Sequence, residues 1–276
     1  MRNIWAVCKR EWVSYFITPI GYVVVGAFAA ISGMGFAIVF IGYARATRAP
    51  ATFGFEVIPD LEETMLSPFL VFCGEVILFI GALITMRLLA EEKSRGTAEL
   101  LRTYPLRNRD IVFGKFAAAM GMVLVLMAVI GVHLGIMAAF THVEPAVLVF
   151  GLVTVFLMSA AFMSLGLFVS AMASNQITAG VMTFALWFVS YVLGSWAKDL
   201  SDKNPAPQGW PESIRNVLGS AYAVVRGLVT ELPLDAHARD MAQGIVEPRD
   251  IAYYVLFTAF FLFLTFRALE TRRWRA

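Results

Sequence analysis

The chain is organised around six long runs of apolar residues separated by shorter polar segments. The runs cover residues 20–43, 65–89, 116–140, 147–173, 179–197 and 251–268. A helix needs about 20 apolar residues to cross the hydrocarbon core of a bilayer, so each run suffices for one crossing. Strands of a membrane β-barrel would alternate apolar and polar residues, and these runs do not. The pattern therefore predicts an all-α membrane protein with six transmembrane helices.

The first run is too long for the apolar core of a secretory signal, which is about 7–15 residues. It also follows a charged leader of 19 residues. We therefore expect it to stay in the mature protein as the first span.

The composition excludes a large soluble module. Hydrophobic residues make up 59% and charged residues 15% of the chain, whereas soluble proteins have about 45–50% and about 25%. The longest polar segment, residues 198–250, is too short for an ATP-hydrolysing, redox or nucleic-acid-binding domain. We expect one membrane domain over residues 1–276 and no nucleic-acid partner.

The basic residues predict the orientation, because cytoplasmic flanks of membrane helices are enriched in Lys and Arg. If both termini are cytoplasmic, the inner segments hold 14 of the 22 basic residues and six of the 20 acidic ones. The outer segments then hold eight basic and 13 acidic residues. We therefore expect a multi-pass protein with cytoplasmic termini.

Residues 1–19 are predicted to form an interfacial helix that ends at Pro19. Aromatic and apolar residues recur at steps of three and four, with charged residues between them, as in helices that lie in the headgroup plane. The residues assigned to this role are Trp5, Lys9, Arg10, Glu11 and Trp12. The alternative is a basic anchor before the first span, which could also touch a partner.

The segment between the second and third spans, residues 91–104, combines charge with an apolar edge. Helical spacing pairs Glu91 with Arg95 and Arg95 with Glu99, while Gly96 weakens the helix. Leu101 lies on an apolar stripe that could enter a groove on another protein. Pro105 should end this helix and Asn108 should cap the third span. The alternative is a solvated hairpin.

The long segment before the last span, residues 198–250, is predicted to be helical after its prolines. Apolar residues from Ile214 to Val229 follow helical spacing, and His237 to Ile245 could form a second short helix. We expect an outer helical loop that lies on or in the outer membrane surface, with a soluble cap on the spans as the alternative.

The sequence lacks the residues of a catalytic or cofactor site. Gly114-Lys115 lacks the other residues of a phosphate-binding loop. His133, His142 and His237 do not have metal-ligand spacing, and Cys8 and Cys73 stand far apart. We expect a non-catalytic chain with no metal or cofactor of its own.

Two polar residues lie inside predicted spans. Glu75 would cost at least about 2.5–3.5 kcal/mol in the bilayer, so it either lines a cleft or is protonated and bonded to a neighbouring helix. His133 lies between Gly131 and Gly135, a spacing that permits close helix packing. Helix contact is the favoured role for His133 over a ligand site.

The stretch Leu89-Ala-Glu-Glu-Lys-Ser-Arg-Gly-Thr-Ala-Glu-Leu-Leu, with a later Pro and Gly-Lys, resembles the ABC-2 type permeases. The end of the chain, from Gly244-Ile-Val-Glu-Pro-Arg-Asp through Arg-Arg-Trp274, looks like the subgroup of gliding-motility-associated exporters. The resemblance covers essentially the whole chain.

This resemblance implies a permease that pairs with a second copy or a paralogue and binds two separate ABC ATPase subunits, which would hold ATP and Mg. It also implies that one segment couples the permease to the ATPase. The matching residues are Glu91, Glu92, Arg95, Gly96, Thr97, Glu99, Leu100 and Leu101. Membrane lipids would be further partners, and the resemblance implies a location in the bacterial inner membrane. The alternatives are a membrane scaffold without transport and an ion-coupled carrier that uses Glu75.

Overall fold

The computed structural model describes residues 2–47, 60–94, 107–141, 143–197, 200–201, 204–207 and 209–273. Every regular element in this part of the chain is helical. Six helical stretches are long and apolar enough to cross a membrane, which confirms the predicted fold class. They contain α2 (Ile20–Ala46), η1 with α3 and α4 (Glu62–Leu66, Ser67–Leu88 and Ala90–Ser94), α6 (Asn108–Phe140), α7 (Pro145–Met172), α8 (Gln176–Ala197) and α11 (Pro248–Arg273).

Prolines mark several helix starts, because their fixed φ suits the first turn and their missing N–H is not needed there. Pro145 and Pro248 are the first residues of α7 and α11, and Pro68 stands in the first turn of α3. The predicted cap at Asn108 is wrong. Arg107 occupies the N-cap, and its backbone N–H donates to the Asp110 carboxylate at 3.3 Å, so a carboxylate in the first turn takes that role.

The centre of the bundle is the pair α3 and α7. A Cβ on Gly81 of α3 would lie 2.9 Å from Met163 Cε, and a Cβ on Gly166 of α7 would collide with Thr85. These glycines let the two helices approach closely, as small residues do in membrane bundles. By contrast α2, α8 and α11 leave most of their apolar residues unburied, available to lipid or to another chain.

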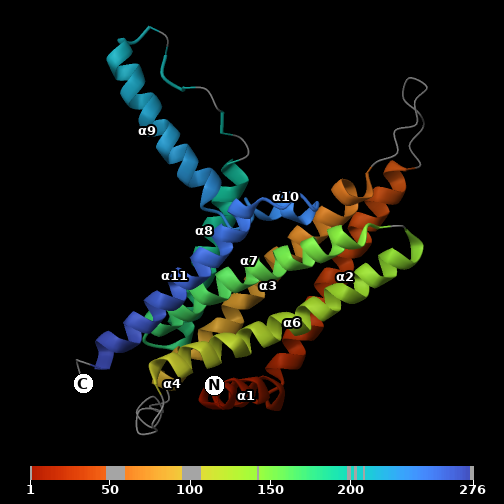
Figure 1. Cartoon of the computed structure of the whole chain (residues 1–276), viewed down its shortest axis with the longest axis vertical. Helices are drawn as coiled ribbons and strands as arrows, with labels where there is room; N and C mark the ends of the chain where they lie inside the picture. Colours follow the sequence, from red (N-terminus) through yellow and green to blue (C-terminus); the bar gives the residue numbers. More distant parts are fainter. Residues whose placement is uncertain are drawn as a thin grey trace.

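The bundle has two distinct ends (Figure 1). At the terminal end, α11 ends and α1 (Arg2–Ile17) runs beneath the bundle beside α6, with α4 nearby. At the other end, here called the α10 end, α10 (Ala238–Ala242) packs against α3 and α7. A helix is confirmed within the predicted range 1–19, at Arg2–Ile17, and its place in the membrane interface stays a prediction. That the terminal end faces the cell interior stays a prediction.

The helical loop before the last span is also confirmed. It contains α9 (Glu212–Glu231) and α10, which lies within the predicted second helix. No described residue of α9 is buried, and α9 projects past the bundle from the end of α8 (Figure 1). Helix α9 therefore does not form a cap on the spans, whereas α10 does. The predicted contact of α9 with a membrane surface remains a prediction.

A buried histidine joins the loop to the last span. His237 Nδ1 lies 2.8 Å from Asp250 Oδ1, and Nε2 lies 3.1 Å from the backbone oxygen of Glu231. Both ring nitrogens thus lie within hydrogen-bonding distance of oxygen atoms. The ring of Tyr253 packs at 4.2 Å between centroids, and Tyr254 Oη donates to the backbone oxygen of Leu234.

We expect His237→Leu to destabilise the α10 end, because it leaves the buried Asp250 carboxylate without its histidine partner. Leaving a buried hydrogen-bonding group without its partner costs about 1–3 kcal/mol, so the thermal unfolding temperature in detergent should fall by about 5 °C. Glu247→Gln, an exposed neighbour, should leave it unchanged. Equal unfolding temperatures for all three proteins would contradict the role of His237.

Candidate functional site

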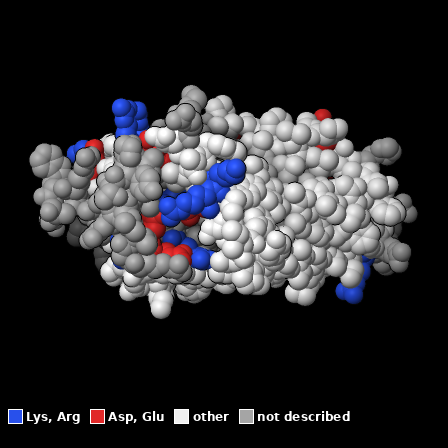
Figure 2. Space-filling model, turned by 90° about the horizontal axis from the view of Figure 1, so that it is seen from below, with Lys and Arg blue, Asp and Glu red and all other residues white. Residues whose placement is uncertain are grey.

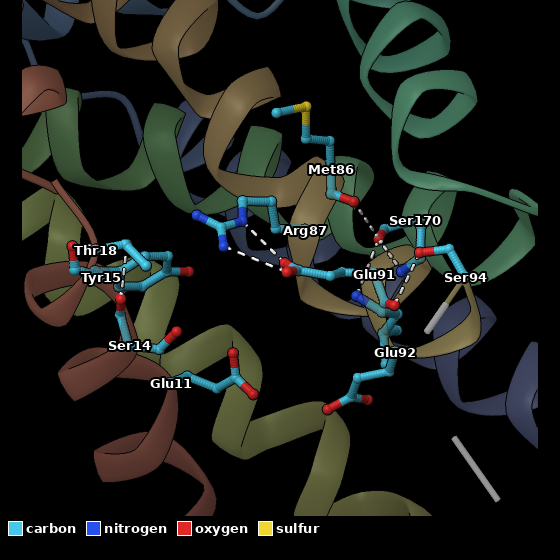
Figure 3. Close-up of polar contacts among 12 residues, drawn as sticks. Glu11, Ser14, Tyr15, Thr18, Met86, Arg87, Glu91, Glu92, Ser94 and Ser170 are labelled. Atoms are coloured by element: carbon cyan, nitrogen blue, oxygen red, sulfur yellow. Dashed lines mark hydrogen bonds and ion pairs between the residues drawn. The ribbon is translucent and has the colours of Figure 1, made fainter. Parts of the chain in front are cut away.

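A fully buried lysine joins three helices at the terminal end. The Lys115 side chain on α6 is 1% exposed. Its Nζ lies 2.8 Å from Glu11 Oε1 on α1 and 2.9 Å from Glu92 Oε1 on α4. Arg10 adds a longer contact to the same Glu92 oxygen, at 3.3 Å. Two cations and two carboxylates therefore form one network, here called the Lys115 network; Figure 3 labels its two glutamates.

The Lys115 network fixes α1 and α4 relative to α6. A buried ammonium is tolerated when carboxylates compensate for its lost hydration, and removing one partner of such a pair costs about 3–5 kcal/mol. Glu11 and Glu92 are separated from Lys115 by 104 and 23 positions. The network therefore holds together elements that are remote in the sequence.

A second set of bonds ties α4 to the end of α7. Ser170 Oγ accepts hydrogen bonds from the backbone N–H groups of Leu89 and Ala90, at 3.1 and 3.0 Å (Figure 3). These two residues lie where the helix is interrupted between α3 and α4. Lys93 Nζ donates to the backbone oxygens of Ser170, Ala171 and Ala173. These carbonyls end α7, where the helix dipole favours a cation. Helix α4 is thus attached to the bundle on two sides.

Of the predicted coupling residues, Glu91 and Glu92 are described. Glu91 pairs with Arg87 four positions before it, with Nε to Oε2 at 2.9 Å, a pair that was not predicted from the sequence. The predicted Glu91–Arg95 and Arg95–Glu99 pairs involve residues outside the described part of the chain. The same holds for the remaining coupling residues, which are Arg95, Gly96, Thr97, Glu99, Leu100 and Leu101.

Helix α1 packs directly on the backbone of α6. A Cβ on Gly114 would lie 2.7 Å from Val7 Cβ, and one on Gly121 would lie 2.6 Å from Trp12 Cζ3. Trp5 and Lys9 lie toward the surface, and with Trp12 they line an apolar groove of about 690 Å³ between α1 and α6. The predicted interfacial residues therefore divide between the Lys115 network and this groove.

Cys8 and Tyr15 lie buried on α1, and burial raises the pKa of each side chain above its usual value. The Cys8 thiol is free. A raised pKa means less thiolate at neutral pH, and thiolate is the form that alkylating reagents attack. Cys8 therefore reports on whether α1 stays seated on α6.

Charged groups concentrate around this site on the terminal face. Seen from below, blue and red side chains gather in one region of the molecule, and most of the remaining described surface is white (Figure 2). A charged region beside an apolar membrane belt is the kind of surface that a polar partner could contact.

The two predicted intramembrane residues are not part of the Lys115 network. Glu75 on α3 accepts a hydrogen bond from Trp187 Nε1 on α8 at 3.2 Å and lines a cavity near the α10 end. His133 packs against Phe36 and Phe69, at 5.3 and 5.7 Å between ring centroids.

The predicted helix contact of His133 therefore comes from its ring. Gly131 and Gly135 flank it, and a Cβ placed on either glycine would have no neighbour within 4 Å among the described residues. Close packing at these two glycines is thus not found in the single chain.

Sequence reasoning missed Lys93, Ser170 and the role of Lys115. Lys115 offered a signal, because a lysine one residue before the predicted third span needs a carboxylate if the helix start is buried. No comparable signal marks Ser170.

The described residues contain no group of three or more His, Cys, Asp or Glu placed to hold a metal ion.

Comparison with known proteins adds two findings. The family described as "ABC-2 family transporter protein" matches residues 17–274. A protein of Pseudomonas aeruginosa named "Probable ABC transporter permease protein NosY" is 32% identical over 121 residues, which cover 41% of this chain and 44% of the relative. That match spans less than half of the relative's length.

We expect Lys115→Met to loosen α1, because Glu11 and Glu92 would then lose the ammonium between them. In a Cys73→Ala background, maleimide labelling of Cys8 at pH 7.5 should become at least about tenfold faster. The raised pKa keeps labelling of the parent protein slow at this pH.

Arg109→Met, which removes an exposed charge from the same helix, is the matched control and should label at the parent rate. The double variant Lys115→Met, Glu11→Gln should recover part of the protection. Unchanged labelling in Lys115→Met would show that the network does not hold α1.

Proposed function

The chain belongs to the ABC-2 transporter family, and we propose that it is the permease subunit of an ATP-driven exporter in the bacterial inner membrane. The family match over residues 17–274, the six apolar helices and the similarity to a protein named as a permease support this proposal. Separate ABC ATPase subunits would bind ATP and Mg, and this chain would move the substrate.

The main structural support for this proposal is the firm attachment of α4 to the bundle. The segment that begins at α4 is the one expected to contact the ATPase. Five described residues hold its start to α6, α1 and α7: Lys115, Glu11, Glu92, Lys93 and Ser170. Moving a two-state equilibrium from 1:99 to 99:1 takes about 5.5 kcal/mol. Buried ion pairs resist separation by a comparable amount, so this joint is strong enough to pass a displacement on.

We infer the following sequence of events. ATP binding brings the ATPase subunits together and shifts α4. The Lys115 network moves the terminal ends of α1 and α6 with it, while Lys93 and Ser170 move the end of α7. Because α7 is packed tightly on α3 around Gly81 and Gly166, these helices move as a unit. The bundle then rocks between inward and outward forms.

A second permease chain would complete the path along which the substrate crosses the membrane. Six helices enclose little space, and α2 and α8 keep most of their apolar surface unburied in the single chain. We propose that a second copy, or a related chain, packs against part of this surface and that lipid covers the rest. An ion-coupled carrier is the second candidate, favoured by Glu75 lining a cavity.

The proposal predicts that an ABC ATPase co-purifies with the tagged chain from its native membrane, identified by mass spectrometry. Glu92→Arg with Leu101→Asp should lose the ATPase and still insert into the membrane. Glu212→Arg, a charge reversal on exposed α9, should retain it. An assembly without an ATPase, or with one that survives the double change, would contradict the proposal.

Coupling is tested separately from docking. With a label at Thr47→Cys, in a Cys8→Ala, Cys73→Ala background, ATP and vanadate should change the distance between the two copies. Lys115→Met should keep the ATPase bound and reduce this change by at least half. A carrier would move substrate without the ATPase, and a scaffold would show no ATP-dependent change.

A further inference from the structure

A cavity of about 860 Å³ opens between α2, α3 and α8 near the α10 end. It runs along η1 and α3 from Glu63 to Phe79, which is about 24 Å at the rise of an α-helix. Asp235 and Gln243, from the segments on either side of α10, stand at its edge. Its volume is in the range of sites for small organic ligands.

Aromatic rings form much of its wall. Phe72 and Phe79 come from α3, and Trp187 and Tyr191 come from α8. The ring of Trp187 contacts aromatic rings of both helices. Its centroid lies 5.6 Å from that of Phe79, and it stacks on Tyr191 with 5.8 Å between centroids. The faces of such rings carry negative electrostatic potential and attract cations, most strongly when water is excluded.

The charged residues of the cavity are all acidic. Glu63, Glu75 and Asp235 line it, and no lysine, arginine or histidine appears among its described lining residues. Trp187 Nε1 donates to Glu75 Oε2 at 3.2 Å, so this carboxylate is held within the aromatic wall. A cation beside Glu75 would meet a carboxylate and ring faces together, which offsets the cost of placing Glu75 in the membrane.

The arrangement suits an organic cation better than a metal ion. Glu63 and Glu75 are 12 positions apart on one helical stretch, about 18 Å, so they cannot share one metal ion. Val71 lies between them along the helix and Val76 follows Glu75. Both side chains offer an apolar body van der Waals contact and offer a metal no ligand.

We propose that this cavity binds an organic cation, an amine or quaternary ammonium or phosphonium group on an apolar body, with Glu75 and the rings of Phe79 and Trp187 as its main contacts. The inference rests on the proposed function, because it names the substrate class that the exporter would carry. The cavity lies in the same chain as the Lys115 network but contains none of its residues.

The test uses two probes of nearly the same size and shape, tetraphenylphosphonium and tetraphenylborate, which differ in the sign of their charge. Binding of each is measured by equilibrium dialysis to the purified chain in lipid nanodiscs, with empty nanodiscs subtracted. We expect saturable binding of the cation, displaced by excess unlabelled cation, and no saturable binding of the anion.

Glu75→Gln should weaken cation binding at least about tenfold while preserving the side-chain shape and the Trp187 hydrogen bond. Phe79→Leu should weaken it at least about threefold through loss of one ring face. Glu144→Gln, which removes an exposed carboxylate outside the cavity, is the matched control and should bind as the parent does. Size-exclusion profiles and unfolding temperatures establish that each variant is folded.

Saturable binding of the anion, absence of saturable cation binding, or unchanged affinity in folded Glu75→Gln would each overturn the proposal. The assay contains no ATPase, so its failure leaves the ATPase association experiment unaffected. Loss of that association with intact cation binding would instead reject the exporter and retain the site.

Discussion

A lysine ammonium that is almost wholly removed from solvent must be surrounded by groups that replace its hydration. Lys115 meets this requirement with Glu11 and Glu92, which belong to two other helices. The position of α1 beneath the bundle and the position of α4 beside it are therefore not independent. Both helix positions are fixed because the Lys115 ammonium needs a carboxylate from each helix. Gly114 and Gly121 allow α1 to approach α6 as closely as this geometry requires.

The fold divides into a packed part and an open part. Helices α3 and α7 bury most of their length against each other and their neighbours, whereas α2, α8 and α11 leave apolar residues uncovered. At the terminal end, α4 is bonded to α6 through Lys115 and to α7 through Ser170. These bonds connect α4 to the packed part of the bundle. The aromatic cavity lies between α3 and the open helices. A change at the terminal end could therefore reach the cavity walls through α3.

The sequence predicted features that depend on neighbours within a few turns. Apolar runs defined the six spans, and three- and four-residue steps defined α1 and α9. Even at this range the sequence did not decide which partner Glu91 takes, because arginines stand four positions before and after it. The described ion pair is with Arg87.

The site could not be predicted in the same way. Lys115 and Glu11 are 104 positions apart, Ser170 meets the chain 80 positions away, and His237 meets Asp250 across 13 positions. Such contacts depend on how helices pack, and hydrophobic periodicity does not specify which polar residues then meet. The small residues Gly131 and Gly135 likewise permit close contact, but their spacing alone does not specify which chain or helix would supply a partner.

The two cations of the Lys115 network differ in their access to dissolved ions. Lys115 is shielded from solvent, while the Arg10 side chain is 63% exposed. Dissolved salt weakens exposed ion pairs as the Debye length shortens, from about 8 Å at physiological ionic strength to about 3 Å at 1 M, and it affects buried pairs far less. Rising salt would therefore weaken the contact of Arg10 first and leave that of Lys115 in place, so the internal attachment of α4 tolerates an ionic strength that would loosen charged contacts on the surface.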